Sequence, residues 1–210
     1  MASKNKSSVA WNIVQEMSIE KLFDLIDSGE KRYSITINKT RYSGGLISTR
    51  LQCIRRNHRC VSCGVEGSIV RLEQYKSDGT INGYHFNVYA KVEDCNYPLG
   101  YRYVTMTQDH IFPHSLGGST TLDNLQTMCL DCNHSKDNSI DFSKIPVIGE
   151  STRQHIWKTI CANNNLTKTF IYFMINPEFN INREAVQSLG VINFSKLQKP
   201  EEILKKVFIT

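Results

Sequence analysis

The sequence predicts an α+β fold, and three observations lead to this class. First, three segments rich in β-branched and aromatic residues are separated by loops that contain glycine or proline, as strands usually are: residues 68–75, 84–92 and 101–111. Second, segments with helical periodicity lie on both sides of these strands. Third, two Cys-x-x-Cys pairs, at 60–63 and 129–132, bracket the strands and can frame everything between them.

The first predicted helix starts after Ser18, in the segment SIEKLFDLIDSG. Ser18 is suited to cap the helix N-terminus, and Gly29 stands where a helix commonly ends. Four apolar residues fall on one face of this helix: Ile19, Leu22, Phe23 and Ile26.

A strand or hairpin and a second helix are predicted next. Residues 32–45, RYSITINKTRYSGG, alternate well enough for a hairpin, and we expect the turn at Gly44–Gly45. Residues 48–57, STRLQCIRRN, are predicted to form a short helix with Leu51 and Ile54 facing inward. Its three arginines are expected to face outward: Arg50, Arg55 and Arg56.

The third predicted strand ends at Asp109–His110, and a loop then enters a short helix within residues 121–139. Three helices are predicted beyond it, at residues 151–165, 182–190 and 199–208. The segment 167–175 is equally compatible with a buried strand or a helix, because its apolar period does not decide. Residues 1–10 are expected to form a loose polar tail.

The cysteines and the hydropathy indicate a reducing compartment. The chain of 210 residues has seven cysteines, and an odd number argues against a disulfide framework. It has no apolar run of the ~18 residues that a bilayer requires, and no apolar stretch follows its basic N-terminus. We therefore expect no membrane partner and a cytoplasmic location, in a bacterium or in a host cell.

The charge is distributed unevenly along the chain. Residues 31–59 contain eight lysines and arginines and no acidic residue, whereas residues 60–150 have a net charge of −5 and residues 151–210 one of +4. Basic side chains often only solvate a surface. An acid-free run of 29 residues instead favours a polyanion held by the basic flanks.

Cys60, Cys63, Cys129 and Cys132 have the spacing of a zinc site. Each Cys-x-x-Cys pair can bind one side of a tetrahedral ion, and Gly64 and Asn133, directly after the pairs, tolerate the left-handed backbone that such turns often need. Four thiolates leave no open position, so this zinc would be structural. The alternatives are chance spacing and a redox pair, but neither pair leads into a clear βαβ unit.

Asp109 and His110 provide groups that phosphodiester cleavage requires. The reaction needs a base that activates water, a cation that offsets charge, and groups that position the backbone. An Asp-His pair is common and means little by itself. Here it is followed by Pro113, by Gly117-Gly118 and by Asn124 before the second cysteine pair.

The segment DHIFPHSLGGSTTLDNLQTMCLDCNHSK resembles the core of the HNH endonucleases, or ββα-metal nucleases, in the branch that has a four-cysteine structural zinc. The resemblance covers residues 58–140. Within the family, the chain is similar to nucleases of phages or mobile elements. It implies that Asp109 binds the catalytic cation, that His110 is the general base, that Asn124 fixes the loop and helps to orient the base, and that Asn133 completes the metal site.

The resemblance leaves some positions open. Family members usually have histidine where this chain has Asn133, and asparagine favours Mg²⁺ or Mn²⁺ over zinc at the catalytic site. His134 is the alternative ligand if the helix starts one residue later. Lys136 and the basic N-terminal flank, with Arg50, Arg55 and Arg56, are expected to contact phosphates. His114 is read as a loop residue.

The sequence therefore predicts a metal-dependent endonuclease of double-stranded DNA. Its expected parts are a basic DNA-holding segment (1–57), an HNH core with zinc (58–145) and a mostly helical extension (146–210). The alternatives are a zinc-stabilised nucleic-acid-binding protein without catalytic activity and a nuclease that acts on RNA. The sequence does not indicate an oligomeric state.

Overall fold

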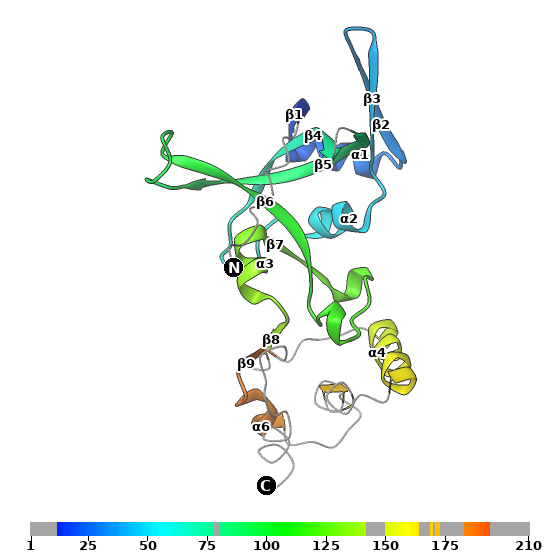
Figure 1. Ribbon diagram of the computed structural model, residues 1–210, viewed down its shortest axis with the longest axis vertical. Helices are drawn as coiled ribbons and strands as arrows, with labels where there is room; N and C mark the ends of the chain where they lie inside the picture. Colours follow the sequence, from blue (N-terminus) through cyan, green and yellow to red (C-terminus); the bar gives the residue numbers. More distant parts are fainter. Residues whose placement is uncertain are drawn as a thin grey trace. The chain divides into compact units, whose positions relative to one another are not determined.

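The computed structural model describes residues 12–77, 80–141, 150–163, 169, 171–172 and 183–193. These residues form a mixed sheet with helices, which confirms the α+β class (Figure 1). The chain divides into two compact units, Met1–Thr107 with Thr127–Leu130, and Gln108–Gln126 with Asp131–Thr210. The predicted tail, the predicted helix at 199–208 and most of the segment 167–175 lie outside the described residues.

The three predicted strands are confirmed as β4 (Gly67–Ser77), β5 (Thr80–Glu93) and β6 (Tyr101–His110). Strand β5 lies between β4 and β6 and runs antiparallel to both. The larger sheet has the order β1-β4-β5-β3-β2, in which β1 is Asn12–Ser18, β2 is Arg32–Ile37 and β3 is Thr40–Gly45. Strand β6 pairs with β5 and also with β7 (Leu125–Cys129).

One face of this sheet forms the core of the first unit. Val70 pairs with Val88 and Leu72 pairs with Phe86, so that alternate residues of β4 and β5 point to the same side. All four side chains are buried. The helices add further buried apolar residues to this unit: Ile19, Leu22, Leu51 and Ile54.

Helix α1 (Ile19–Asp27) follows the sequence prediction closely. The Ser18 hydroxyl accepts a hydrogen bond from the Lys21 N–H at 3.3 Å and caps the helix. Gly29, just beyond the helix, has a φ of 77°, which is the left-handed conformation that ends many helices. The predicted bounds and cap are therefore confirmed.

The predicted hairpin is present, but its expected turn at Gly44–Gly45 is wrong. Strands β2 (Arg32–Ile37) and β3 (Thr40–Gly45) are joined by a two-residue turn at Asn38 and Lys39, whose φ angles are 48° and 64°. Two successive positive φ angles match the right-handed twist of the flanking strands. Gly44 is needed elsewhere, since a Cβ there would lie 2.7 Å from Leu72 and 2.8 Å from Phe86.

Helix α2 (Thr49–Arg56) is confirmed, with Leu51 and Ile54 buried, but the outward position expected of Arg50 is wrong. The Arg50 guanidinium donates to the Asn87 side chain at 2.9 Å and to the Phe86 carbonyl. A guanidinium can reach β5 from the first turn of the helix because its stem is long.

The second cysteine pair follows a strand that the sequence prediction missed. β7 (Leu125–Cys129) pairs with β6, and helix α3 (Leu130–Lys136) begins directly after it. Residues 139–193 contain four more described elements: β8 (Ser139–Asp141), α4 (Glu150–Asn163), α6 (Arg183–Gln187) and β9 (Val191–Asn193). Helices α4 and α6 match the predictions, whereas the β8–β9 pair does not appear in them. Among the described residues, no helix is long and apolar enough to cross a membrane.

Candidate active site

A pocket of about 350 Å³ lies between the C-terminal end of β6 and helix α3. Ten residues line it: Asp109, His110, Pro113, His114, Ser115, Asn133, His134, Lys136, Asp137 and Asn138. The pocket thus brings together Asp109, His110, Asn133 and Lys136, which were all predicted as site residues. Asn124 lies in the 3₁₀ turn η2 (Leu122–Asn124) and does not line it.

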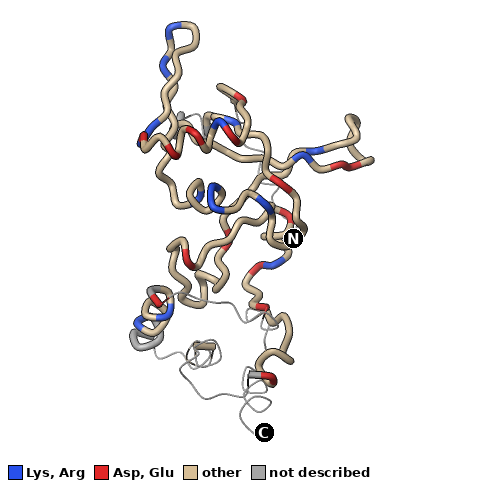
Figure 2. The backbone as a smooth tube through the Cα atoms, turned by 180° about the vertical axis from the view of Figure 1, so that it is seen from behind, with Lys and Arg blue, Asp and Glu red and all other residues tan. Residues whose placement is uncertain are grey.

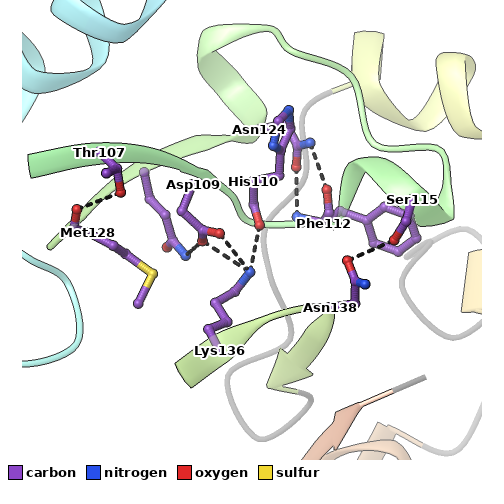
Figure 3. A network of polar contacts seen from close by, with 10 residues as sticks. Thr107, Asp109, His110, Phe112, Ser115, Asn124, Met128, Lys136 and Asn138 are labelled. Carbon is purple, nitrogen blue, oxygen red and sulfur yellow. Dashed lines mark hydrogen bonds and ion pairs between the residues drawn. The ribbon is translucent and has the colours of Figure 1, made fainter. Parts of the chain in front are cut away.

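Asp109 is the buried acid of the pocket, with only 6% of its surface exposed. The Lys136 ammonium lies 3.2 Å from Oδ1 and 3.0 Å from Oδ2 of this carboxylate (Figure 3). Gln126 donates to Oδ2 at 2.7 Å, and Lys136 also donates to the His110 carbonyl at 2.8 Å. A buried carboxylate needs such compensation, and these contacts fix its position at the strand end.

His110 is half-buried beside a second histidine. Its Nε2 lies 3.1 Å from the Thr120 hydroxyl, and its ring centroid is 5.5 Å from that of His114. Burial, and then the neighbouring His114 and Lys136, lower the pKa of His110 below its usual 6.5, while Asp109 acts in the opposite direction. A lowered pKa keeps the imidazole neutral at pH 7, the form in which it can accept a proton.

The amide of Asn124 is completely buried and holds the loop after His110 (Figure 3). Its Oδ1 accepts from the Phe112 N–H at 2.9 Å, and its Nδ2 donates to the carbonyls of Phe112 at 3.0 Å and Ser119 at 2.9 Å. A Cβ on Gly118 would lie 2.0 Å from the Phe112 oxygen, so this loop closes tightly around the amide. The geometry agrees with the loop-fixing role expected of Asn124.

Asn133 and His134 are successive residues of α3, and both line the pocket. The expectation that Asn133 occupies a left-handed turn is wrong, because α3 begins at Leu130 and the positive φ of 50° falls on Asp137. Cys129 ends strand β7, and Cys132 lies in helix α3. Asn133 and His134, which follow the second cysteine pair, therefore lie on a helical turn.

The sequence predicted His114 as a loop residue and did not identify Ser115, and both residues line the pocket. His114 begins the 3₁₀ turn η1 (His114–Leu116) after Pro113, and it is an exposed pocket residue. The next residue, Ser115, donates to the Asn138 side chain at 2.8 Å. The signal that could have found them is the short Pro-His-Ser-Leu-Gly-Gly segment, whose two glycines predict a tight return towards the strand end.

The sulfurs of Cys60, Cys63, Cys129 and Cys132 lie within 4.8 Å of one another, and the two of Cys63 and Cys129 are 3.8 Å apart. Tetrahedral zinc with bonds of about 2.3 Å requires sulfurs about 3.8 Å apart. The four cysteines are therefore close enough to form a zinc site.

The surroundings of Cys60 favour a thiolate. Burial raises the pKa of its thiol, but backbone N–H groups of Cys63, Cys129 and Ser62 outweigh this and lower the pKa to about 7. Gly64, with a φ of 77°, donates its N–H to the Cys60 carbonyl at 2.9 Å and closes the first turn as predicted. Thiolate is the form that binds a metal ion.

Two further cysteines whose side chains the structure describes, Cys53 and Cys95, fall outside this cluster. Cys53 is buried, with its sulfur 3.6 Å from the Thr127 hydroxyl, as expected for a packed thiol. Cys95 is exposed. The side chain of Cys161 lies outside the described residues.

The arginines expected to bind nucleic acid have different environments. Arg50 is bonded to β5, as described above. Arg55 forms an ion pair with Asp27 at 2.7 Å and stacks over the Phe23 ring at 4.8 Å. Arg56 is exposed. Their role in binding stays a prediction.

Residues 95–144 match the family model of the HNH endonucleases. With the four close cysteines, this match confirms the resemblance inferred from the sequence. At the level of the family it indicates a nuclease that acts on nucleic acid with a divalent metal. A search of curated proteins and a search of solved structures each found no match.

Loss of one cysteine of the cluster is expected to release the zinc. Cys132→Ser replaces a thiolate with a weak ligand, so the purified protein should contain well under one zinc per chain and melt at a lower temperature. Metal content by atomic emission and thermal unfolding measure this. Cys95→Ser is the matched control and should keep its zinc; a Cys132→Ser protein that retains a full equivalent would contradict the four-sulfur site.

Removal of the Asn124 amide is expected to destabilise the loop. Asn124→Ala leaves the Phe112 N–H and two carbonyls buried without their partner, which should lower the free energy of unfolding by about 3 kcal/mol or more. Asn96→Ala, in an exposed turn, is the control and should change stability by about 0.5 kcal/mol or less. Urea unfolding of both variants measures the difference, and equal midpoints would refute the structural role.

Proposed function

We propose that the chain is a metal-dependent endonuclease of double-stranded DNA, in which His110 activates a water molecule for attack on a phosphodiester. The observation that carries this proposal is the shared pocket of Asp109, His110 and Asn133, within the residues that match the HNH family model. The products expected from the family resemblance carry 5′-phosphate and 3′-hydroxyl ends.

His110 is the general base in this proposal. It lies at the end of a strand, its ring nitrogen is held near the Thr120 hydroxyl, and its pKa is lowered. Its neutral ring can take the proton of a water molecule placed in the pocket, and general-base catalysis of this kind contributes about 100- to 10,000-fold.

Asp109 and Asn133 are the proposed ligands of one divalent cation. A carboxylate and an amide oxygen form a hard donor set, which fits Mg²⁺ or Mn²⁺. In the structure the ammonium of Lys136 lies against the Asp109 carboxylate, so a divalent cation bound there would share or displace this contact. When bound, the metal ion offsets charge on the phosphate and on the leaving oxygen.

The remaining residues position the substrate and the site. Lys136 can contact a phosphate, and the zinc of the four cysteines is proposed to be structural, since four thiolates leave no open position. Asn124 acts as a positioning residue through the loop that carries Phe112. The N-terminal segment 1–57 and the extension 146–210 are proposed as parts that hold the duplex on either side of the cut.

Replacement of the general base should abolish cleavage and preserve binding. His110→Ala is expected to slow the nicking of supercoiled plasmid in Mg²⁺ or Mn²⁺ by about 100-fold or more, with unchanged zinc content and melting temperature. His85→Ala, at an exposed position of β5 outside the pocket, is the control and should cut at the normal rate.

The same assay separates the rival functions. A binding protein without catalytic activity would shift the plasmid band in a gel without nicking it, with or without EDTA. A nuclease that acts on RNA would cut an RNA substrate in preference to the plasmid. Normal cutting by His110→Ala would show that the base is assigned to the wrong residue.

Two single substitutions test whether Asn133 or its neighbour His134 on α3 binds the metal ion. Asn133→Ala should raise the Mg²⁺ concentration for half-maximal activity by about tenfold or more, because it removes a direct ligand. His134→Ala should change it by less than about threefold. The reverse order would assign the ligand to His134.

A further inference from the structure

We propose that the exposed face of the β2–β3 hairpin binds duplex DNA in the major groove. The identity of the partner rests on the proposed function, but the binding step can be measured apart from cleavage. The surface is defined by Arg32, Ser34, Thr36, Arg41 and Ser43, and is called the ribbon face below.

The strand register places these side chains together. Ser34 pairs with Ser43 and Thr36 pairs with Arg41, so they point to one side of the ribbon, and Arg32 lies on the same side opposite Gly45. Four of the five residues are exposed and Ser43 is half-buried. The face carries only hydroxyl and guanidinium groups.

Hydrogen bonds within the face orient the two arginines. Arg32 donates from Nε to the Ser43 hydroxyl at 3.2 Å, and Arg41 donates to the Ser34 hydroxyl at 3.3 Å. Each guanidinium has five N–H donors and these contacts use one, so both retain donors for another molecule. Figure 2 shows Lys and Arg but no Asp or Glu along this hairpin, as the acid-free run 31–59 requires.

The opposite side of the ribbon is used to anchor it. The Tyr33 hydroxyl donates to the Gln15 side chain at 3.0 Å, and the Tyr42 ring meets Tyr84 edge to face at 5.3 Å. Gly44 lies against Leu72 and Phe86, where a side chain would not fit. The base is therefore fixed to the sheet, while the turn at Asn38–Lys39 extends away from it (Figure 1).

The dimensions and chemistry of the ribbon match a DNA groove. A two-stranded ribbon fits the major groove, and six residues per strand span about 20 Å. Arginine binds guanine O6 and N7 there through two hydrogen bonds, and serine or threonine can bind any base. Lys39, in the turn, adds a charge that can meet the phosphate backbone.

Helix α2 is the competing basic element, and its contacts make it the weaker candidate. The guanidinium of Arg50 is held by β5, and that of Arg55 is neutralised by Asp27. Within the described part of the chain, the hydrogen bonds of Arg32 and Arg41 go to the neutral hydroxyls of Ser43 and Ser34. The ribbon face therefore offers more uncompensated positive charge.

The experiment measures equilibrium binding of a labelled 30-base-pair duplex by the full-length His110→Ala protein, so that no cleavage occurs. Adding Arg32→Gln/Arg41→Gln should weaken binding about tenfold or more and reduce the slope of log K against log salt by about 1 to 2. The control Arg59→Gln/Lys91→Gln removes the same charge from exposed sites outside the segments 1–57 and 146–210, and should weaken binding less than about threefold.

A footprint identifies the groove. Bound protein should protect guanine N7 from dimethyl sulfate, and the protection should disappear in Arg32→Gln/Arg41→Gln. A second variant, Arg32→Lys/Arg41→Lys, keeps the charge and should retain the salt slope while the guanine protection weakens, because lysine lacks the planar pair of donors of a guanidinium. Equal losses in the ribbon variant and its control, protection of adenine N3 in the minor groove, or preference for RNA would each overturn the proposal. Failure of the nuclease proposal would instead appear as a wild-type protein that binds the duplex without nicking plasmid.

Discussion

The geometry of the candidate site depends on one buried amide. Asn124 is completely buried and satisfies three backbone groups of the loop that follows β6. The Ile111 N–H also donates to the backbone carbonyl of Asn124 at 2.8 Å. Because the loop is tied back at 111, 112 and 119, the strand end that carries Asp109 and His110 has little freedom to shift.

The charge of the pocket follows from the same arrangement. A buried carboxylate beside a partly buried imidazole would be costly without a cation, and α3 supplies the Lys136 ammonium at this point. The Lys136 ammonium stabilises the ionised carboxylate of Asp109 and disfavours protonation of His110. One helix therefore brings a cation to Asp109 and also the amide proposed to share a metal ion with it.

Much of this fold was predictable because local signals and burial agree. The Ser18 cap, the three β-rich segments and the ends at Gly29 and His110 all appear where residue types predict them. The candidate residues Asp109, His110 and Asn133 were recognisable as a combined pattern, although their shared pocket depends on tertiary structure.

The errors have physical causes that single residues illustrate. Asn38 and Lys39 both adopt the positive φ angles that a two-residue hairpin turn needs. Of the two glycines expected to form the turn, Gly44 is instead required for close packing inside the sheet. β7 escaped notice because Leu125–Cys129 is short and alternates weakly. Arg50 was predicted to face solvent because of its charge. Its hydrogen bond to Asn87 depends on the position of β5, which the local sequence does not show.

The two adjacent glycines of the site loop serve different needs. Gly117 has a φ of 103°, a backbone state that side chains disfavour, whereas Gly118 lacks space for any Cβ. Neither position can therefore acquire a side chain cheaply. In this loop, side chains that line the pocket can therefore vary at Pro113, His114 and Ser115, and a change of pocket shape or charge on this side would arise from those positions.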